Sequence, residues 1–359
     1  MYAKCVLNCM KVLLVGHDFD FSAGDGISRY SHELYRGLSQ YANVDTISTS
    51  TLPRPVRALF SINVKNYDIV HLMYPNVARV KKGKAKMVTT WHDLRVFDKY
   101  LESGQYRVKP KLIERLNIAN SIIKRWTLQN YSDTDAVLLN SSQTRRELHG
   151  YLQAHKLYNA KKLYTITSLG VDPDFLKAKV WNGKRSDFAY MGSIHFRHKN
   201  LPGLLRIFDK IAGRCDANLH IFTFSPNSGE LLKRELAECK NLSYKNVFLH
   251  PKAPDKEIAR YLPKLSAYLQ LSKHEGLGMS VLAALAMGTN VLMLKDSVIP
   301  RETTKYSIRL GEAKLVDKAV ELAKNPRPAP RNAIEYARSF TWERTAKETL
   351  AVYSKILQK

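Results

Sequence analysis

The feature that most constrains the fold is a pattern of alternating elements over residues 269–294, which read LQLSKHEGLGMSVLAALAMGTNVLML. A short apolar run is followed by a polar loop that contains Glu275, Gly276 and Gly278. A run of small apolar residues then ends at Gly288, and a second short apolar run follows it. Apolar runs of strand length on either side of an apolar helix indicate a strand–loop–helix–strand unit of a parallel sheet.

The loop at Glu275 lies between the carboxyl end of a predicted strand and the amino end of a predicted helix. Backbone N–H groups there have no partner within the helix, and the helix dipole adds positive potential, so the position suits phosphate or another anion. Glycines let a ligand approach the backbone because they carry no Cβ atom. A carboxylate would repel phosphate, so Glu275 is better suited to bind sugar hydroxyls or to stabilise a developing cation beside the phosphate. An ordinary parallel-sheet crossover would share part of this pattern.

The segment SKHEGLGMSVLAALAMGTNVL resembles the donor-site signature of retaining GT-B glycosyltransferases, the group called glycosyltransferase family 4. That signature has two glutamates eight positions apart around a Gly-x-Gly turn. Here Glu275 matches the first glutamate, but Ala283 replaces the second, which the family uses to bond the ribose hydroxyls. On this resemblance the side chain at position 283 should face the cleft. The resemblance implies donor binding by one continuous loop: Glu275, Gly276, Leu277, Gly278, Met279 and Ser280.

The first half of the chain carries two further motifs of this family. MKVLLVG and GDGISRY predict a strand, a loop and a helix that starts near Gly26. They resemble the glycine turn after the family's first strand, with Asp25 at the first glycine position, and the resemblance adds Gly26 to the donor-binding residues. VDTIST, NYDIVHLMYP and KAKMVTTWHDL predict three more strands. A histidine at a strand end is often structural, but VTTWHDL resembles the family's Thr-x-His-Asp segment. That resemblance implies that His92 reaches the donor sugar from the amino-terminal domain.

Two other segments of the first half can be interpreted without reference to the glycosyltransferase family. Residues 107–128 predict an amphipathic helix with a basic outer face, which either packs on the core or lies on an anionic membrane surface. Asp133 and Asp135 form an Asp-x-Asp, which binds metal in the other glycosyltransferase fold. Here the pair precedes the predicted strand at residues 136–139 instead of following it, so we expect no metal at this position.

A second run of strand, loop and helix starts at DFAYMGSIHFRHKNLPGLL, after the polar linker WNGKRSD. Its loop carries basic side chains suited to a diphosphate. Lys199 matches a family lysine with this role, and Ser193 replaces an arginine that often follows the glycine, for which Arg197 is the substitute. The resemblance therefore adds four residues to the donor site: Gly192, Ser193, Arg197 and Lys199. The tail FTWERTAKETLAVYSKIL resembles the family's last helix, which crosses back onto the first domain.

Net charge restricts the kinds of partner. The chain has 57 Lys and Arg against 32 Asp and Glu, a net charge of +25. Residues 51–130 hold 16 basic and 5 acidic residues, a surplus of 11. Such a surplus favours an anionic partner, either lipid headgroups or phosphorylated substrates, unless it is only a solvated surface. No nucleic-acid-binding signature is recognisable, so we do not expect a nucleic-acid partner.

Length and cysteine usage indicate two domains in a reducing compartment. A chain of 359 residues has room for two domains of ordinary size. No run approaches the ~18 apolar residues of a membrane span, and no signal peptide is recognisable. The four cysteines form no CxxC pair, and Cys5 and Cys9 have no further ligands nearby, so we expect no metal there. We therefore expect a cytoplasmic protein, peripheral on the inner face of the membrane.

Taken together, the motifs resemble the family from Met10 to Lys359. They imply an α/β GT-B fold, with two Rossmann-like parallel-sheet domains that face each other across a cleft. We expect an acceptor-side domain at residues 1–175, in which residues 1–9 are an extension. A donor-binding domain should follow at residues 176–340, and a helix at residues 341–359 should return to the first domain.

The implied activity is retaining transfer of a sugar from a nucleoside diphosphate sugar to a lipid-linked or cell-envelope glycan, without a metal or another cofactor. Glu275 and His92 would hold the sugar hydroxyls, and Lys199 would stabilise the leaving diphosphate. No carboxylate nucleophile stands out, which favours a front-face path assisted by the leaving phosphate. A non-catalytic binding or partner subunit of the same fold is one alternative, because the nucleoside contacts are altered. A GT-B sugar-nucleotide epimerase is another, but we find no acid and base residues for it.

Overall fold

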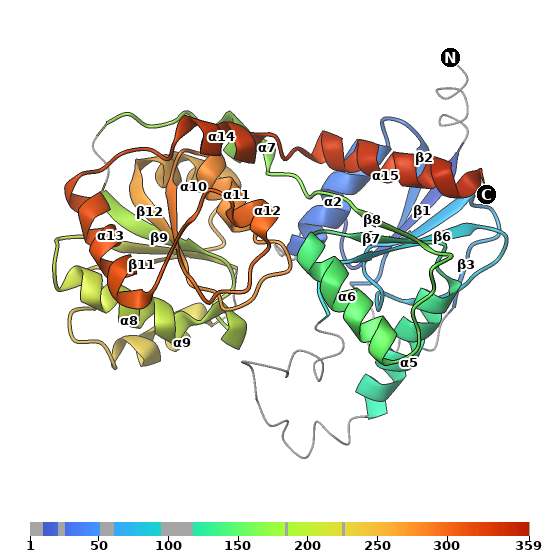
Figure 1. The fold of residues 1–359 in the computed structure, drawn as a ribbon, viewed down its shortest axis with the longest axis horizontal. Helices are drawn as coiled ribbons and strands as arrows, with labels where there is room; N and C mark the ends of the chain where they lie inside the picture. Colours follow the sequence, from blue (N-terminus) through green and yellow to red (C-terminus); the bar gives the residue numbers. More distant parts are fainter. Residues whose placement is uncertain are drawn as a thin grey trace. The chain divides into compact units, whose positions relative to one another are not determined.

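The computed structural model describes residues 10–20, 26–50, 61–94, 118–183, 186–224 and 227–358. The chain forms two compact units (Figure 1), which are described one at a time. Unit 1 consists of Met1–Leu169 together with Trp342–Lys359, and unit 2 consists of Gly170–Thr341. The boundary expected between residues 175 and 176 falls inside helix α7 (Pro173–Lys177), which belongs to unit 2. Residues 1–9, expected to be an extension, lie outside the described residues.

Unit 1 is built on a parallel sheet of six strands in the order β2-β1-β4-β6-β7-β8. These strands are β1 (Lys11–Gly16), β2 (Asn43–Ser48), β4 (Ile69–Leu72), β6 (Lys86–Trp91), β7 (Ala136–Leu139) and β8 (Leu163–Ile166). The short strands β3 (Ser61–Asn63) and β5 (Arg79–Lys81) pair separately. Every residue of β4 and β7 is buried, which explains their continuous apolar runs, because helices and loops cover both faces of a parallel sheet.

Four helices of unit 1 cover this sheet (Figure 1). They are α2 (Gly26–Leu38), α5 (Ile118–Asp133), α6 (Ser142–Ala154) and α15 (Trp342–Leu357). Helix α2 begins at Gly26 as the sequence predicts, and Leu34 and Leu38 are fully buried on its inner face. The helix predicted at residues 107–128 is described only from Ile118 onward, and α5 continues to Asp133. The carboxyl-terminal helix α15 packs against α2.

Unit 2 has a second parallel sheet of six strands, in the order β11-β10-β9-β12-β13-β14. The strands are β9 (Ser186–Met191), β10 (Leu219–Thr223), β11 (Val247–Pro251), β12 (Leu265–Gln270), β13 (Asn290–Leu294) and β14 (Ile308–Leu310). The chain builds outward from β9 to β11 and then returns to the other side of β9 to add β12, β13 and β14. The strand order therefore reverses between β9 and β12, which is where ligands bind in open α/β sheets.

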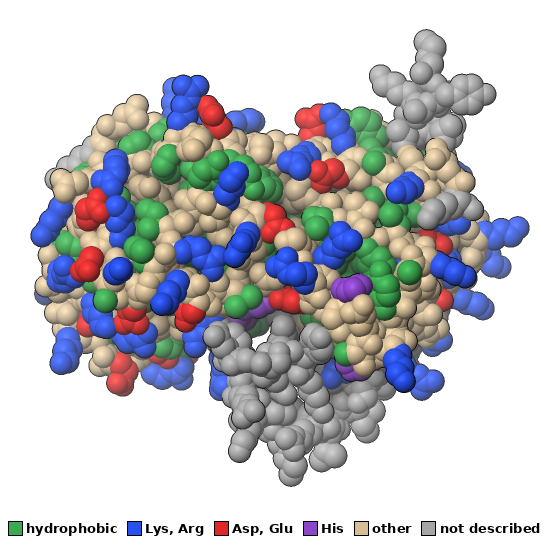
Figure 2. All heavy atoms as spheres, in the orientation of Figure 1, with side chains coloured by type: hydrophobic (Ala, Val, Ile, Leu, Met, Phe, Trp, Pro, Cys, Tyr) green, Lys and Arg blue, Asp and Glu red, His purple; other side chains and the backbone are tan. Residues whose placement is uncertain are grey.

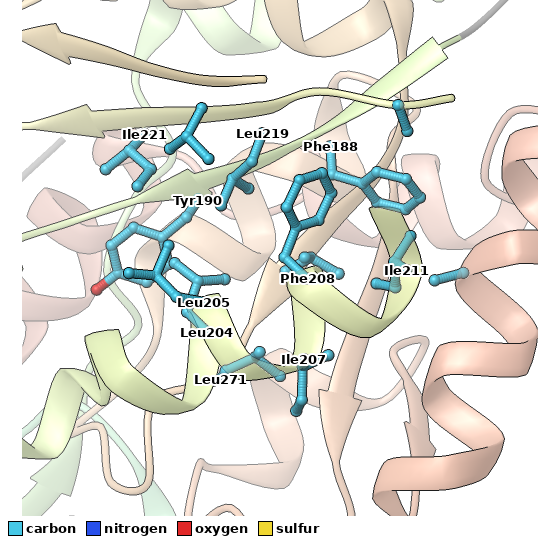
Figure 3. Packing of buried hydrophobic residues seen from close by; sticks show 14 of the residues in the cluster. Phe188, Tyr190, Leu204, Leu205, Ile207, Phe208, Ile211, Leu219, Ile221 and Leu271 are labelled. Atoms are coloured by element: carbon cyan, nitrogen blue, oxygen red, sulfur yellow. The ribbon is translucent and has the colours of Figure 1, made fainter. Parts of the chain in front are cut away.

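Helices cover both faces of the unit 2 sheet (Figure 1). One face carries α8 (Leu201–Ala212), α9 (Ser228–Leu236) and α13 (Glu312–Lys324). The other face carries α7, α10 (Asp255–Tyr261), α11 (Met279–Ala286) and α14 (Arg331–Arg338). Figure 3 shows the first layer, in which Leu205 and Phe208 of α8 lie against Phe188 and Tyr190 of β9. This packing fixes β9 and the start of α8, and therefore also the loop between them.

The surface carries the excess of basic residues that the composition requires. Figure 2 shows Lys and Arg side chains spread over the visible face, with fewer Asp and Glu side chains among them. Much of the segment at residues 51–130 with the surplus of 11 basic residues lies outside the described residues. Within the described part of the chain, no helix combines the length and the apolar character needed to span a bilayer.

Candidate active site

Two loops of unit 2 meet at the point where its strand order reverses. The first follows β9 and contains a short 3-10 helix, η3 (Arg197–Lys199), and the second follows β12. The Asn200 side-chain amide donates to the carbonyl of Leu271 at 3.0 Å, and the Lys273 N–H donates to the carbonyl of His198 at 2.7 Å. Each loop therefore holds the other in place, although 76 residues separate Lys199 from Glu275 in sequence.

Lys199 and Glu275, both predicted for the donor site, bind each other. The Lys199 ammonium nitrogen lies 2.7 Å from Oε1 and 2.9 Å from Oε2 of Glu275. The two side chains are 19% and 13% exposed. Burial alone would raise the pKa of Glu275, but the charge and hydrogen bonds of Lys199, together with smaller effects of Ser272 and His198, outweigh it and lower the pKa below its usual value. The site therefore holds an ionised carboxylate and an ammonium in contact.

Three polar residues orient Glu275: Gln270 and Tyr268, which sequence reasoning missed, and Ser280, which was predicted for the donor loop. The Gln270 side-chain amide, at the end of β12, donates to Glu275 Oε1 at 3.3 Å. Its own oxygen lies 2.7 Å from the Tyr268 hydroxyl and 3.3 Å from the Ser280 hydroxyl. Gln270 and Tyr268 are almost completely buried, so their rotamers are fixed. A glutamine at the last position of a buried strand that leads into the glycine loop was the signal that could have identified Gln270.

The backbone at the start of α11 has the conformation that the glycine turn predicts. Gly278 has φ +86°, a conformation that favours glycine, and a Cβ atom there would make a tight contact of 3.1 Å with Ile299 Cγ2. The N–H groups of Met279 and Ser280 lie in the first helical turn, where no carbonyl within the helix can accept them. This end of α11 can therefore bind an anion.

The other predicted residues of unit 2 lie in the same two loops. Gly192 has φ +140°, and a Cβ atom there would lie 3.9 Å from the Lys199 ammonium. The carbonyl of Ser193 accepts the Tyr190 hydroxyl at 3.1 Å. Arg197 is exposed, and among the described residues no carboxylate pairs with it.

Leu277 of the second loop is 5% exposed, and its carbonyl accepts a hydrogen bond from Thr303 Oγ1 at 2.6 Å. Its side chain therefore packs inward and contributes to the fold of the loop. Gly276 lies between Glu275 and this buried residue.

Position 283, which was expected to face the cleft, carries a buried side chain. Ala283 is 5% exposed and belongs to the apolar cluster that α11 forms with α7, α10 and α14. Helix α14, which the sequence did not predict, makes extensive contact with α11. Ala283 is therefore a packing residue of unit 2 in this chain.

The unit 1 residues of the predicted site lie at the carboxyl edge of its sheet. His92 directly follows β6 and is 9% exposed. Its Nε2 lies 3.0 Å from the carbonyl of Met73, and its ring meets that of Tyr30 edge to face at 4.7 Å. The Asn140 side chain donates to the His92 carbonyl at 2.9 Å. Gly26 is exposed at the first position of α2, whereas Asp25 lies outside the described residues.

Near His92, four buried polar side chains are linked by consecutive hydrogen bonds. These bonds link Tyr353 of α15 to His71 at 2.6 Å, His71 to Thr90 at 2.7 Å, and Thr90 to Tyr30 at 2.8 Å. His71 is completely buried, and desolvation, with a smaller effect of His92, lowers its pKa to about 3. The imidazole is therefore neutral at physiological pH, and it connects the carboxyl-terminal helix to β6, the strand that His92 follows.

Comparison with known proteins gives the class of the fold. Residues 172–340, nearly all of unit 2, match the family model described as Glycosyl transferases group 1. None of the curated proteins compared with the chain matches it in sequence. The solved structure of a sucrose-phosphate synthase from Thermosynechococcus elongatus superposes with a TM-score of 0.69 at 14% identity, over 97% of this chain and 99% of that one.

Two other solved structures resemble the whole chain to a similar degree. WaaG, a glycosyltransferase involved in lipopolysaccharide biosynthesis, gives a TM-score of 0.65 at 11% identity and covers 96% of this chain and 100% of its own. An α,α-trehalose 6-phosphate synthase from Burkholderia multivorans gives 0.66 at 10% identity, with 97% of each chain covered. The protein thus has the predicted GT-B fold, and its second unit carries a glycosyltransferase group 1 domain.

Proposed function

We propose that the protein is a retaining glycosyltransferase that uses a nucleoside diphosphate sugar. The observation that carries this proposal is the pairing of Lys199 with Glu275 beside the glycine turn that begins α11. An ammonium and helical N–H groups suit a diphosphate, and a carboxylate within 3 Å of that ammonium suits the hydroxyls of the attached sugar. Few ligands other than a sugar phosphate need both kinds of group side by side.

The chemistry we propose needs only the groups of this site. The bond between the anomeric carbon and the diphosphate oxygen breaks, and charge develops on the leaving group, where Lys199, Arg197 and the N–H groups of Met279 and Ser280 would stabilise it. The acceptor oxygen bonds to the same face of the anomeric carbon and passes its proton to the leaving phosphate. Glu275 would hold a sugar hydroxyl and favour the positive character of the ring. His92 is assigned a further hydroxyl of the donor sugar, and no metal takes part.

For the acceptor we propose a lipid-linked or cell-envelope glycan, reached at the inner face of the membrane. The basic surplus of residues 51–130 supports an anionic acceptor or an anionic membrane surface. WaaG, which has a similar fold, is a glycosyltransferase involved in the biosynthesis of lipopolysaccharide, and lipopolysaccharide is an envelope glycan. The protein itself would remain cytoplasmic and bind the membrane peripherally.

A second candidate is a sugar-nucleotide-binding subunit without transferase activity. The alanine at position 283 favours it, because the family's second glutamate, which bonds the ribose, is missing. Such a subunit would bind donors through Lys199 but would not turn them over.

One experiment separates these two candidates. The protein is first screened for thermal stabilisation by common nucleoside diphosphate sugars, and the donor that binds is then incubated with and without membrane glycolipid extract. Release of free nucleoside diphosphate that depends on Glu275 supports the transferase. Stabilisation by a donor without any release would support the binding subunit, and the absence of both would contradict the proposal.

A further inference from the structure

Unit 1 contains a cavity of about 260 Å³ that the proposed donor chemistry does not use. It lies at the amino ends of three neighbouring strands: Lys86 begins β6, Asp135 precedes β7 and Lys162 precedes β8. His92 follows the carboxyl end of β6. The cavity and His92 therefore lie at opposite edges of the same sheet.

The walls of the cavity are rich in charge, and the charges do not cancel. The ionisable residues that line it are four lysines and two aspartates: Lys82, Lys86, Lys161, Lys162, Asp133 and Asp135. Two positive charges remain in excess. Ser132 and Asn159 add hydrogen-bonding groups to the wall, and Ile356 of α15 adds an apolar one.

Two of the lysines hold the fold together. The Lys162 ammonium donates to the carbonyls of Ser132 and Thr134, at 2.8 and 2.5 Å, and so caps the end of α5. The Lys82 ammonium lies 2.8 Å from Asp135 Oδ2, the same oxygen that accepts the Met87 N–H at 2.8 Å. Both lysines still have N–H groups left, because an ammonium has three donors.

The other two lysines have no such role. No carboxylate among the described residues pairs with Lys86 or Lys161. Burial lowers the pKa of Lys162, and repulsion by the charge of Lys82 adds to this shift, whereas Asp135 and Asp133 oppose it. An anion in the cavity would relieve this repulsion and supply the missing partners.

We propose that this cavity binds a phosphate monoester. A phosphate monoester carries a charge of about −1.5 to −2 at pH 7, which matches the excess of two positive charges. Its oxygens accept hydrogen bonds from ammonium groups, and lysine is a common phosphate ligand. The volume is several times the roughly 30 Å³ that one water occupies, so a small polar group attached to the phosphate also fits. A soluble sugar phosphate and the headgroup of phosphatidic acid share this chemistry.

The two aspartates of the Asp-x-Asp pair, Asp133 and Asp135, line this cavity and affect its charge. Among the described residues no group of three or more His, Cys, Asp and Glu side chains is placed to hold a metal ion. Asp135 is engaged by Lys82 and the Met87 N–H, whereas Asp133 reduces the positive charge of the cavity. Asp133 therefore weakens the binding of an anion, and its removal should strengthen it.

The test measures the dissociation constant of glycerol 3-phosphate from the rise in melting temperature at constant ionic strength. The double variant Lys86→Gln, Lys161→Gln should bind at least tenfold more weakly, because it removes the charges without removing a structural contact. The matched control Lys233→Gln, Lys240→Gln removes two exposed lysines of unit 2 and should bind as the parent does. Lys199→Ala removes the ammonium of the proposed donor site, so any binding that this variant loses belongs to that site and not to the cavity.

Two further measurements complete the test. Asp133→Asn should bind about threefold more tightly, whereas Asp216→Asn, an exposed position of unit 2, should have no effect. Vesicles of phosphatidylcholine with phosphatidic acid serve as the second probe. Loss of vesicle binding in the Lys86, Lys161 double variant would identify a lipid headgroup, and loss of glycerol 3-phosphate binding alone would identify a soluble ligand. If neither probe depends on these two lysines, the proposal is wrong.

Discussion

Lys199 and Glu275 form a two-pronged ion pair, with the ammonium nitrogen 2.7 and 2.9 Å from the two carboxylate oxygens. In the proposed function the lysine binds the diphosphate and the carboxylate binds the sugar. A bound donor must therefore replace the contact between Lys199 and Glu275 with contacts from each of them to the donor. The exchange costs little if the phosphate takes the ammonium while the sugar hydroxyls take the carboxylate, because each charge then keeps a partner.

The first prediction concerns the carboxylate. Glu275→Gln keeps the shape of the side chain but removes its charge. We expect turnover to fall by ~100-fold or more, the order lost when one preorganised group is removed from an active site. The melting temperature should change by only a few degrees. Glu335→Gln, an exposed position of α14, is the control and should retain full activity. Undiminished turnover in Glu275→Gln would refute the assignment of the site.

A second prediction uses the pH dependence of the same pair. The lowered pKa of Glu275 stabilises the parent at pH values above the usual carboxyl pKa, and this stabilisation is lost as pH falls through the lowered value. Lys199→Met removes the largest effect that opposes burial and leaves only the smaller ones of Ser272 and His198, so the pKa of Glu275 should rise and the ionised carboxylate should destabilise the variant at neutral pH. The stability gap between parent and variant should therefore be largest near pH 7 and smallest near pH 4.

Urea unfolding at several pH values measures this gap. Lys273→Met removes an exposed lysine from the same loop and controls for net charge. Its gap from the parent should not shrink on acidification in this way. The same Lys199→Met protein should bind the nucleoside diphosphate sugar at least tenfold more weakly by calorimetry. A gap that is constant from pH 7 to pH 4 would show that the pair does not control the ionisation of Glu275.

Much of the fold could be predicted from the sequence, because a parallel strand buried on both faces is a continuous apolar run. The strand predicted at residues 136–139 is β7 (Ala136–Leu139), and the helix predicted near Gly26 is α2. The donor loop was also recognisable, because its glycines and charged residues are local in sequence. Lys199 and Glu275 could each be named, but not their contact, which depends on two strands being neighbours in the sheet.

The buried parts of the site could not be predicted in the same way. The orientation of Ala283 depends on how α14, nearly 50 residues further along the chain, packs against α11. His71 looked like one more residue of an apolar strand, and only the return of α15 to unit 1 places Tyr353 against it. Both features arise from contacts between distant segments, which a pattern read along the chain does not contain.

The third prediction concerns His71. Because its pKa in the folded protein is about 3, the unfolded chain binds a proton near pH 6.5 that the native protein does not. The free energy of unfolding of unit 1 should therefore fall as pH drops from 6.5 towards 3, by up to about 1.4 kcal/mol per pH unit from this residue. Trp181 is the one tryptophan of unit 2, so Trp181→Phe makes tryptophan fluorescence a probe of unit 1 alone.

In that background, His71→Gln should be less stable at pH 7 but should lose part of the acid dependence. His149→Gln, on the outer helix α6, should leave the acid dependence unchanged. Equal slopes in the parent and in His71→Gln would contradict the idea that His71 is buried in its neutral form.

The fourth prediction concerns the membrane. The surplus of 11 basic residues in residues 51–130 should make the protein sediment with anionic vesicles at low salt. Binding should decrease as ionic strength rises, because the Debye length is only ~10 Å at 0.1 M salt. Neutral phosphatidylcholine vesicles are the control. Equal binding to neutral vesicles, or binding that salt does not weaken, would exclude an electrostatic membrane surface.

The last prediction reverses what the family signature suggests for position 283. The signature implies that Ala283→Glu restores a ribose contact and tightens nucleotide binding, by about tenfold if one good hydrogen bond is gained. Because Ala283 lies in an apolar cluster, we expect instead that the larger side chain overpacks the space beneath α11, which typically costs about 1–3 kcal/mol. Burial of its charge should cost more unless the carboxylate reaches water.

The neutral variant Ala283→Gln separates these two costs. It has the same size as glutamate, so overpacking should destabilise both variants, and only Ala283→Glu should lose further stability as pH rises from 4 to 8. Calorimetry with the donor that binds best should show no gain in affinity for either variant. A tenfold tighter Ala283→Glu protein of unchanged stability would mean that the carboxylate reaches the ribose after all. In that case the burial of Ala283 would be a property of its small side chain and not of the position.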